Sequence, residues 1–362
     1  MKQFPHIDIL RAVAALLVVV YHVSVLGELD LPIDNAWAVP FRYGWIGVDL
    51  FLVISGFVIT LSAAKAYDIS PHGFKLDFMR RRLYRLVPLY WMTCLIFLFL
   101  VRPEVLLRPA GELCAVLISH LLFFQNISHH THGVINGVSW SLALEMQFYV
   151  VLVLFMGQLK RLGALRVFVT LTLLAWCWRY GTTLILKPGE AIAHLQVVYS
   201  TQLPGTLDAF GVGIAIALML HQGQIKVLFR PGAIVSLAWF GAMATLLWLA
   251  WFLVRTNASY WTVQGMVVFW RTLLALGFGA GLMAVITLPL PSGGVMRLIH
   301  FVGEISYGIY LWHFLTLLAL LQLTTLRGVS LLWVLLVGTV CLASMSWHFM
   351  EKPWIRKSVI SK

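Results

Sequence analysis

Apolar stretches of membrane-spanning length recur along the whole chain. Eleven of them lie at 7–26, 44–64, 86–101, 112–126, 138–156, 164–183, 203–221, 232–253, 262–287, 305–325 and 330–349. A transmembrane helix needs about 20 predominantly apolar residues. The chain of 362 residues is 60% hydrophobic and only 11% charged, whereas soluble domains have about a quarter of their residues charged. The sequence therefore predicts an all-α integral membrane protein.

Lysine and arginine are concentrated in alternate connections, and this bias predicts the orientation of the helices. The connection at 65–85 holds six basic residues, whereas the one at 27–43 holds three acids and one arginine. The later basic connections contain Lys160, Arg161 and Arg166, then Lys226 and Arg230, then Arg297 and His300, then Arg356, Lys357 and Lys362. We expect all of them to be cytoplasmic, together with both chain termini.

One apolar stretch must fail to cross, because three candidates lie between the cytoplasmic connections at 65–85 and 157–166. The stretch at 112–126 is short and is flanked by Arg108, Glu112 and the polar segment NISHHTHG. We expect it to be a re-entrant or interfacial helix, which is tolerated where protein covers its ends. About ten transmembrane helices remain, in a single membrane domain over residues 1–362. The first stretch contains Arg11 and His22 and is followed by no small-residue cleavage site, so we expect a retained helix.

Cysteine and histidine spacing predicts neither a disulfide framework nor a metal site. The four cysteines lie in separate apolar segments without a CxxC pair. His129, His130 and His132 have no aspartate or cysteine at ligand spacing. The net charge of +12 is spread over short connections between apolar stretches. This pattern indicates that the basic residues set the orientation of the helices and contact membrane lipid, rather than bind nucleic acid.

Arg11 and His22 bracket the first apolar stretch. Eleven positions at 100° each bring two side chains to within about 20° of one face of a helix, roughly 16 Å apart along the axis. Alone, Arg11 is explained as a snorkelling anchor and His22 as an interfacial residue. Together on one face, they are candidates for a functional site, because ionisable groups within a membrane are costly.

The second stretch, GWIGVDLFLVISGFVIT, contains Asp49 near its outer end and Ser55-Gly56 at mid-depth. We expect Asp49 to lie at about the depth of His22, where a carboxylate would orient the imidazole and stabilise its protonated form. Ser55 and Gly56 are also explained by close helix packing.

Two arginines stand three positions apart where the chain enters the membrane, in RRRLYRLVPLYW. Arg82 and Arg85 therefore lie on one helical face. Forked guanidinium groups suit phosphate oxygens, so the pair is a candidate phosphate site. A positive-inside cluster would explain the number of charges but not their spacing.

Further polar residues occur within later stretches. In GVSWSLALEMQFYV, Ser141 and Glu145 stand at i and i+4, with Tyr149 one turn further. Asp208 lies in LDAFGVG, and Ser306, Tyr310 and His313 lie in SYGIYLWH, where His313 is also explained as a satisfied core histidine. Glu351-Lys352-Pro353 ends the last stretch and is explained as a helix stop.

These segments, in this order, resemble the acyltransferase 3 family of bacterial membrane O-acyltransferases. The resemblance spans nearly the whole chain and rests on Arg11 with ten residues to His22, FLVISGF at 51–57, RLYR at 82–85, WSLALEMQFYV at 140–150, SYGIYLWH at 306–313 and EKP at 351–353. One departure is Met146, which stands where the family often has a second acid, so only Glu145 can fill that role. The extra periplasmic hydrolase-like domain of some members is not matched, and we expect a stand-alone enzyme.

The resemblance implies acyl transfer from cytoplasmic acyl-CoA, most commonly acetyl-CoA, to a hydroxyl of a surface polysaccharide or lipid-linked saccharide at the bacterial inner membrane. It implies no permanently bound cofactor. We expect Arg82 and Arg85 to bind the CoA phosphates. His22 would be the general base, with Arg11, Asp49 and Glu145 as further catalytic residues, and Ser55, Ser141, Tyr149, Ser306 and His313 in supporting roles.

Two alternatives remain open from the sequence. His22 could accept the acyl group covalently instead of acting as a base. A polytopic protein with buried arginine, histidine and acids is also typical of proton-coupled transporters and of flippases for glycans. The absence of internal repeats and of paired broken helices argues against transport. The sequence leaves open the sugar, the acyl group, the leaflet and the oligomeric state.

Overall fold

A computed structural model describes residues 6–32, 35–186, 190–224, 231–256, 263–289 and 293–360, and these residues form helices without any strand. The long helices are α1 (Ile7–Leu26), α3 (Gly47–Ile69), α4 (Phe74–Ile96), α6 (Trp140–Ile185), α8 (Leu207–His221), α9 (Ala233–Thr256), α10 (Gln264–Thr287), α12 (Ser306–Leu323) and α13 (Gly328–Ser346). The shorter helices are α2 (Val39–Arg42), α5 (Ala110–Leu121), α7 (Glu190–Ser200), α11 (Gly294–Glu304) and α14 (Lys352–Ile360). Lys226, Arg230 and Lys362 lie outside the described residues.

Within the described part of the chain, nine helical segments are long and apolar enough to cross a membrane. They coincide with nine of the ten predicted spans, which confirms the all-α membrane fold. The tenth prediction, 164–183, is helical as the second part of α6 but is not among the nine, and it carries Arg166 and Arg179 within its apolar residues. Gly163, with φ 77° and ψ 168°, divides α6 and turns the chain back.

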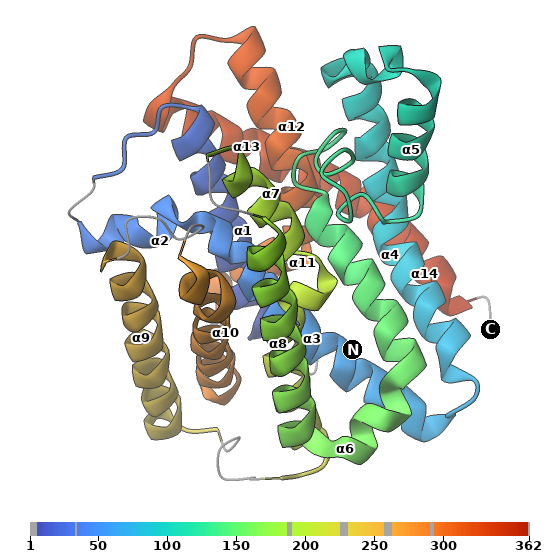
Figure 1. Cartoon of the computed structure of the whole chain (residues 1–362), viewed down its shortest axis with the longest axis vertical. Helices are drawn as coiled ribbons and strands as arrows, with labels where there is room; N and C mark the ends of the chain where they lie inside the picture. Colours follow the sequence, from blue (N-terminus) through green and yellow to red (C-terminus); the bar gives the residue numbers. More distant parts are fainter. Residues whose placement is uncertain are drawn as a thin grey trace.

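The short stretch at 112–126 forms α5, a helix of 12 residues that is too short to cross the bilayer. It lies beside the upper end of α4, which continues as a π-helix over Phe97–Val101 (Figure 1). Leu117, Ile118 and Leu121 on α5 are exposed. The prediction of a helix that does not span is therefore confirmed.

Two expected boundaries are corrected by the structure. The basic connection at 65–85 is mostly helical, because α3 continues to Ile69 and α4 begins at Phe74. The arginines at 80–85 thus lie on a helix that tolerates Pro88 in its interior. At the other end, Glu351 does not stop the chain, because a π-helix over Trp347–Glu351 joins α13 to α14. In that turn, Ser346 donates a hydrogen bond to Glu351 Oε1 at 3.2 Å.

The basic helix ends gather at one end of the bundle. Asp68 at the end of α3 contacts both Lys160 of α6 and His221 at the end of α8. Asp8 at the start of α1 contacts His300 of α11. The clustering agrees with the predicted alternation of the connections, and the cytoplasmic assignment of this end stays a prediction.

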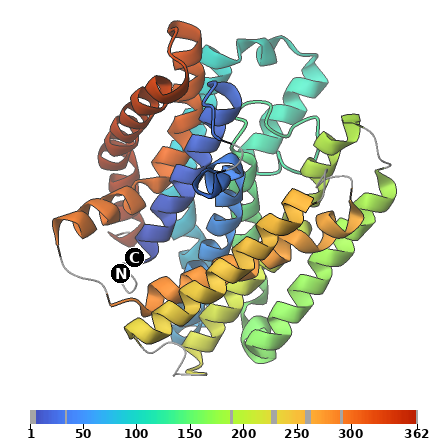
Figure 2. The ribbon, with the colours of Figure 1, turned by 90° about the vertical axis from the view of Figure 1, so that its left-hand side faces the viewer.

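Figure 2 shows α1 between the α12–α13 pair on one side and the α9–α10 pair on the other. In Figure 1, α9 lies on the left of the bundle and α4 and α14 lie on the right, with α8 and α6 between them. Behind these, α3 packs closely on α8. Within this arrangement, α1, α3, α4, α6 and α12 contact one another.

Two glycines allow α3 and α8 to pack with their backbones in close approach. A Cβ on Gly213 would lie 2.2 Å from the carbonyl oxygen of Val53, and one on Gly56 would lie 2.4 Å from that of Phe210. Small residues at helix crossings have this use in membranes. The packing explanation for Gly56 is therefore confirmed.

We expect Gly213→Ala to destabilise the protein by about 1–3 kcal/mol, because overpacking a close crossing forces backbone shifts. Gly241→Ala on α9 is the matched control, since nothing lies within 4 Å of its added Cβ. Thermal unfolding in detergent measures both variants. Equal midpoints would contradict the assigned role of the crossing.

Candidate functional site

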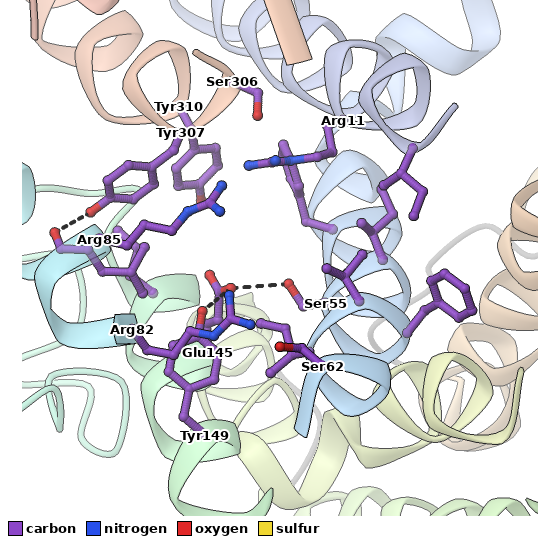
Figure 3. Close-up of a pocket in the computed structure, with 18 of the residues that line it drawn as sticks. Arg11, Ser55, Ser62, Arg82, Arg85, Glu145, Tyr149, Ser306, Tyr307 and Tyr310 are labelled. Atoms are coloured by element: carbon purple, nitrogen blue, oxygen red, sulfur yellow. Dashed lines mark hydrogen bonds between the residues drawn. The ribbon is translucent and has the colours of Figure 1, made fainter. Parts of the chain in front are cut away.

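A cavity of about 530 Å³ lies among α1, α3, α4, α6 and α12 (Figure 3). Its basic lining residues are Arg11, Lys65, Arg81, Arg82 and Arg85. Its acidic lining residues are Asp8, Glu145 and Glu304. The cavity thus collects an excess of positive charge within a membrane domain, where isolated charges are costly and mark binding or transport sites.

Arg82 and Arg85 project into the cavity from one face of α4, as their spacing predicts (Figure 3). The Arg82 guanidinium lies 5.3 Å from the ring centroid of Phe78 and 5.7 Å from that of Tyr149, a cation–π arrangement. In the described part of the chain, no acidic group comes within 4.0 Å of either guanidinium. Both side chains therefore keep their forked donors for an anion.

Glu145 lines the same cavity as the arginines and is held by two hydroxyl groups (Figure 3). Tyr149 donates a hydrogen bond to Glu145 Oε1 at 2.5 Å, and Ser55 of α3 donates to the same oxygen at 3.2 Å. The contact between Ser55 and Glu145 joins residues 90 positions apart. The structure thus brings together Arg11, Arg82, Arg85, Glu145 and Tyr149, which the sequence singled out one segment at a time.

Tyr310 lines the cavity from α12. Its hydroxyl donates to the carbonyl oxygen of Val138 at 2.8 Å, so the Ser141 hydroxyl is the donor in the 2.8 Å bond between Ser141 and Tyr310. The Tyr310 ring centroid lies 5.8 Å from that of His313. Tyr310 therefore lines the cavity and also lies beside His313.

His22 does not appear among the described residues that line the cavity. His22 and Arg11 both face α12, as the eleven-residue spacing predicts: Arg11 shares the cavity with Tyr310, and His22 contacts His313. His22 Nδ1 lies 2.8 Å from the Val18 carbonyl oxygen and 3.3 Å from His313 Nε2. The site thus has two compartments, one cationic and one with an imidazole pair.

Asp49 does not support His22 as expected. Its carboxylate oxygen Oδ1 instead accepts a hydrogen bond from Arg271 of α10 at 2.8 Å, and both side chains are buried. Arg271 also lies 5.2 Å from the Trp45 ring centroid. The sequence interpretation chose the wrong neighbour because the relative rotation of α1, α3 and α10 is not encoded in any one segment.

Asp208 belongs to a second buried ion pair outside the cavity. Arg179 of α6 donates to Asp208 Oδ2 at 2.6 Å, and Thr272 of α10 donates to the same oxygen at 2.5 Å. Sequence reasoning missed Arg179 and Arg271. A charged residue within a strongly apolar stretch was the signal that would have found both.

The remaining predicted site residues have simpler surroundings. Ser306 starts α12, lines the cavity and donates to the Gly303 carbonyl oxygen at 2.9 Å. Tyr307, which the sequence did not single out, also lines it and donates to the Leu86 carbonyl oxygen at 2.7 Å. His129 accepts or donates a hydrogen bond with Tyr199 at 2.9 Å. Among the residues described, no cluster of histidine, cysteine and acidic side chains could hold a metal ion.

Comparison with known proteins gives one family and several relatives. A family model described as an acyltransferase domain matches residues 4–348. The peptidoglycan O-acetyltransferase OatA of Listeria monocytogenes is 27% identical and aligns with 99% of this chain and 56% of its own length. Nodulation protein 10 of Rhizobium leguminosarum is 26% identical over 98% of this chain and 95% of its own length.

A third relative, the O-acetyltransferase OatA of Staphylococcus aureus, is 23% identical over 98% of this chain and 58% of its own length. The chain therefore spans little more than half the length of the two OatA proteins. No solved structure matches it.

Proposed function

We propose that this chain, which belongs to the acyltransferase family, is a membrane O-acetyltransferase that moves an acetyl group from cytoplasmic acetyl-CoA to a hydroxyl of a cell-surface polysaccharide or lipid-linked saccharide. The nine apolar helices among its described residues make it a multi-pass membrane protein, and we place it in the bacterial inner membrane. The observation that carries the proposal is the arginine-lined cavity beneath a half-buried histidine.

The cavity suits the donor. Coenzyme A carries several phosphate negative charges on one end and a thioester on a long flexible arm. Arg82 and Arg85 line the cavity, and their forked donors match phosphate oxygens. With this end of the bundle facing the cytoplasm, the donor enters where it is made. The arm then extends past Arg11 toward Tyr310 and Ser141, on the side of the cavity next to His313 and His22.

The acceptor requires a base, because a sugar hydroxyl is not ionised near neutral pH. In the proposed reaction His22 Nε2 takes the hydroxyl proton while the oxygen attacks the thioester carbonyl carbon. The carbon–sulfur bond breaks, the ester forms, and the thiolate of coenzyme A leaves and later takes a proton. Glu145, hydrogen-bonded by Ser55 and Tyr149, balances the charge of the arginines in the cavity.

The names of the two OatA relatives describe O-acetylation, and one specifies peptidoglycan. They support a polysaccharide acceptor and an acetyl group for this chain. A flippase or proton-coupled transporter is the competing function. Deleting the gene separates the two functions, because loss of an O-acetyltransferase leaves surface polymer present without acetyl esters, whereas loss of a flippase removes the polymer.

The test is transfer of radiolabelled acetyl-CoA to saccharide acceptors by the full chain in proteoliposomes, with label then released by mild alkali as expected of an ester. We expect Arg82→Ala and Arg85→Ala each to raise the KM for acetyl-CoA by about 10-fold or more, because a charge-assisted hydrogen bond contributes about 1.5–3 kcal/mol. Arg297→Ala on the exposed face of α11 is the control. An unchanged KM in both cavity variants would remove the phosphate assignment.

A further inference from the structure

His22 has an imidazole neighbour rather than a carboxylate. His313 Nε2 lies 3.3 Å from His22 Nδ1, and the ring centroids are 5.1 Å apart. His313 is fully buried on α12, whereas His22 is only half-buried. The two residues stand 291 positions apart, so this contact is built by the packing of α1 on α12.

The carbonyl oxygens around the pair define where the protons lie. A backbone carbonyl only accepts hydrogen bonds, so a ring nitrogen beside it carries the hydrogen. His313 Nδ1 lies 3.2 Å from the Ile309 carbonyl oxygen, so in the neutral ring its Nε2 carries the lone pair. His22 Nδ1 lies 2.8 Å from the Val18 carbonyl oxygen and therefore carries the hydrogen.

These assignments give one consistent arrangement. The His22 Nδ1–H is shared between the Val18 carbonyl oxygen and His313 Nε2, a three-centre hydrogen bond. His22 Nε2 is then the unprotonated nitrogen. Aromatic rings hold both imidazoles in place, since Phe314 lies 5.2 Å from His22 and Tyr310 lies 5.8 Å from His313 between ring centroids.

We propose that His313 is the positioning residue of His22: it accepts the Nδ1–H bond and so holds the neutral ring with Nε2 presented to the acceptor hydroxyl. This inference rests on the proposed function, in which His22 is the general base. When Nε2 takes the hydroxyl proton, His22 becomes a cation and its Nδ1–H bond to His313 becomes charge-assisted, which strengthens it as the reaction proceeds. The partner of the base is thus a second histidine and not Asp49.

Three substitutions at position 313 test this role. In Gln the side-chain oxygen reaches about as far as Nε2 of histidine, in Asn it reaches only about as far as Nδ1, and Leu offers no acceptor. Loss of an orienting partner typically lowers activity 10–100-fold. We expect His313→Leu and His313→Asn to lower kcat by about this factor, with the KM for acetyl-CoA unchanged. His313→Gln should restore kcat to within about threefold of the original protein, since it alone replaces the acceptor.

The control is His348→Leu, because His348 is exposed on the π-helix that follows α13 and bonds only its own helix through Ser344. Thermal unfolding of each variant separates misfolding from loss of the hydrogen bond. The Gln and Asn variants differ by only one methylene, so a difference in their kcat reports the position of the acceptor oxygen. Equal kcat in the Gln, Asn and Leu variants, or a change in KM alone, would overturn the positioning role while leaving the proposed function intact. A chain with His313 unchanged that transfers no acetyl group from acetyl-CoA would overturn the proposed function itself.

Discussion

Replacing His22 with alanine should lower the rate of saccharide O-acetylation by about 10²–10⁴-fold, the range that a general base contributes. His313, the imidazole beside it, is fully buried and so does not replace His22 at the acceptor hydroxyl. The KM for acetyl-CoA should change little, because Arg82 and Arg85 line the cavity and His22 is not among its described lining residues. Initial rates with labelled acetyl-CoA measure both parameters.

His72→Ala is the matched control, since His72 is exposed in the short connection between α3 and α4. The same assay without an acceptor distinguishes the base from a covalent intermediate. A general base leaves the protein unlabelled after rapid mixing with labelled acetyl-CoA, whereas an acylated His22 retains label that His22→Ala lacks. An alanine variant with full activity would exclude both roles.

The spans were predictable from sequence because each follows from its own residues. Apolar length sets the nine spans, and the 3.6-residue repeat places Arg11 and His22 on one face and Arg82 and Arg85 on another. Counting basic connections predicted that one of three stretches does not cross, and the short length and polar flanks of 112–126 identified which one. Boundaries were less predictable, because a charged segment such as 74–85 continues a helix as readily as it forms a connection.

Pairings between helices were not predictable, because they depend on how each helix is rotated against its neighbours. Asp49 was assigned to His22 on depth alone, and the structure places Arg271 of α10 against it. Likewise, Glu145 and Ser55 were each singled out, but their contact depends on the packing of α6 on α3. Polar residues in apolar stretches could be found from sequence, whereas their partners could not.

The second large effect concerns stability. Arg179→Met should destabilise the fold by about 3–5 kcal/mol, because it leaves Asp208 buried without its cation. Arg179 is 0% exposed and joins three segments: it donates to Asp208 on α8, to Thr272 on α10 and to the Gly205 carbonyl oxygen. Free energies of unfolding from titration with a denaturing detergent, together with thermal midpoints, measure the loss.

Two further variants identify the cause as an uncompensated charge. The double variant Arg179→Met with Asp208→Leu removes both charges and should recover part of the stability, since an apolar pair of similar volume often matches a buried ion pair. Asp68→Asn tests an exposed pair, because Asp68 is 47% exposed where it meets Lys160, and should cost no more than about 1 kcal/mol. A double variant less stable than Arg179→Met would show that shape rather than charge governs the site.

This ion pair also bears on the arginine-lined cavity, because α8 packs on α3 through Gly56 and Gly213. Ser55, the neighbour of Gly56, holds Glu145 in the cavity. If α8 shifts after the loss of Arg179, we expect α3 to move with it and the Ser55 hydroxyl to separate from Glu145. This change occurs in the cavity and not at His22 or His313. We expect Arg179→Met to raise the KM for acetyl-CoA more than it lowers kcat, the reverse of the pattern expected for His22→Ala.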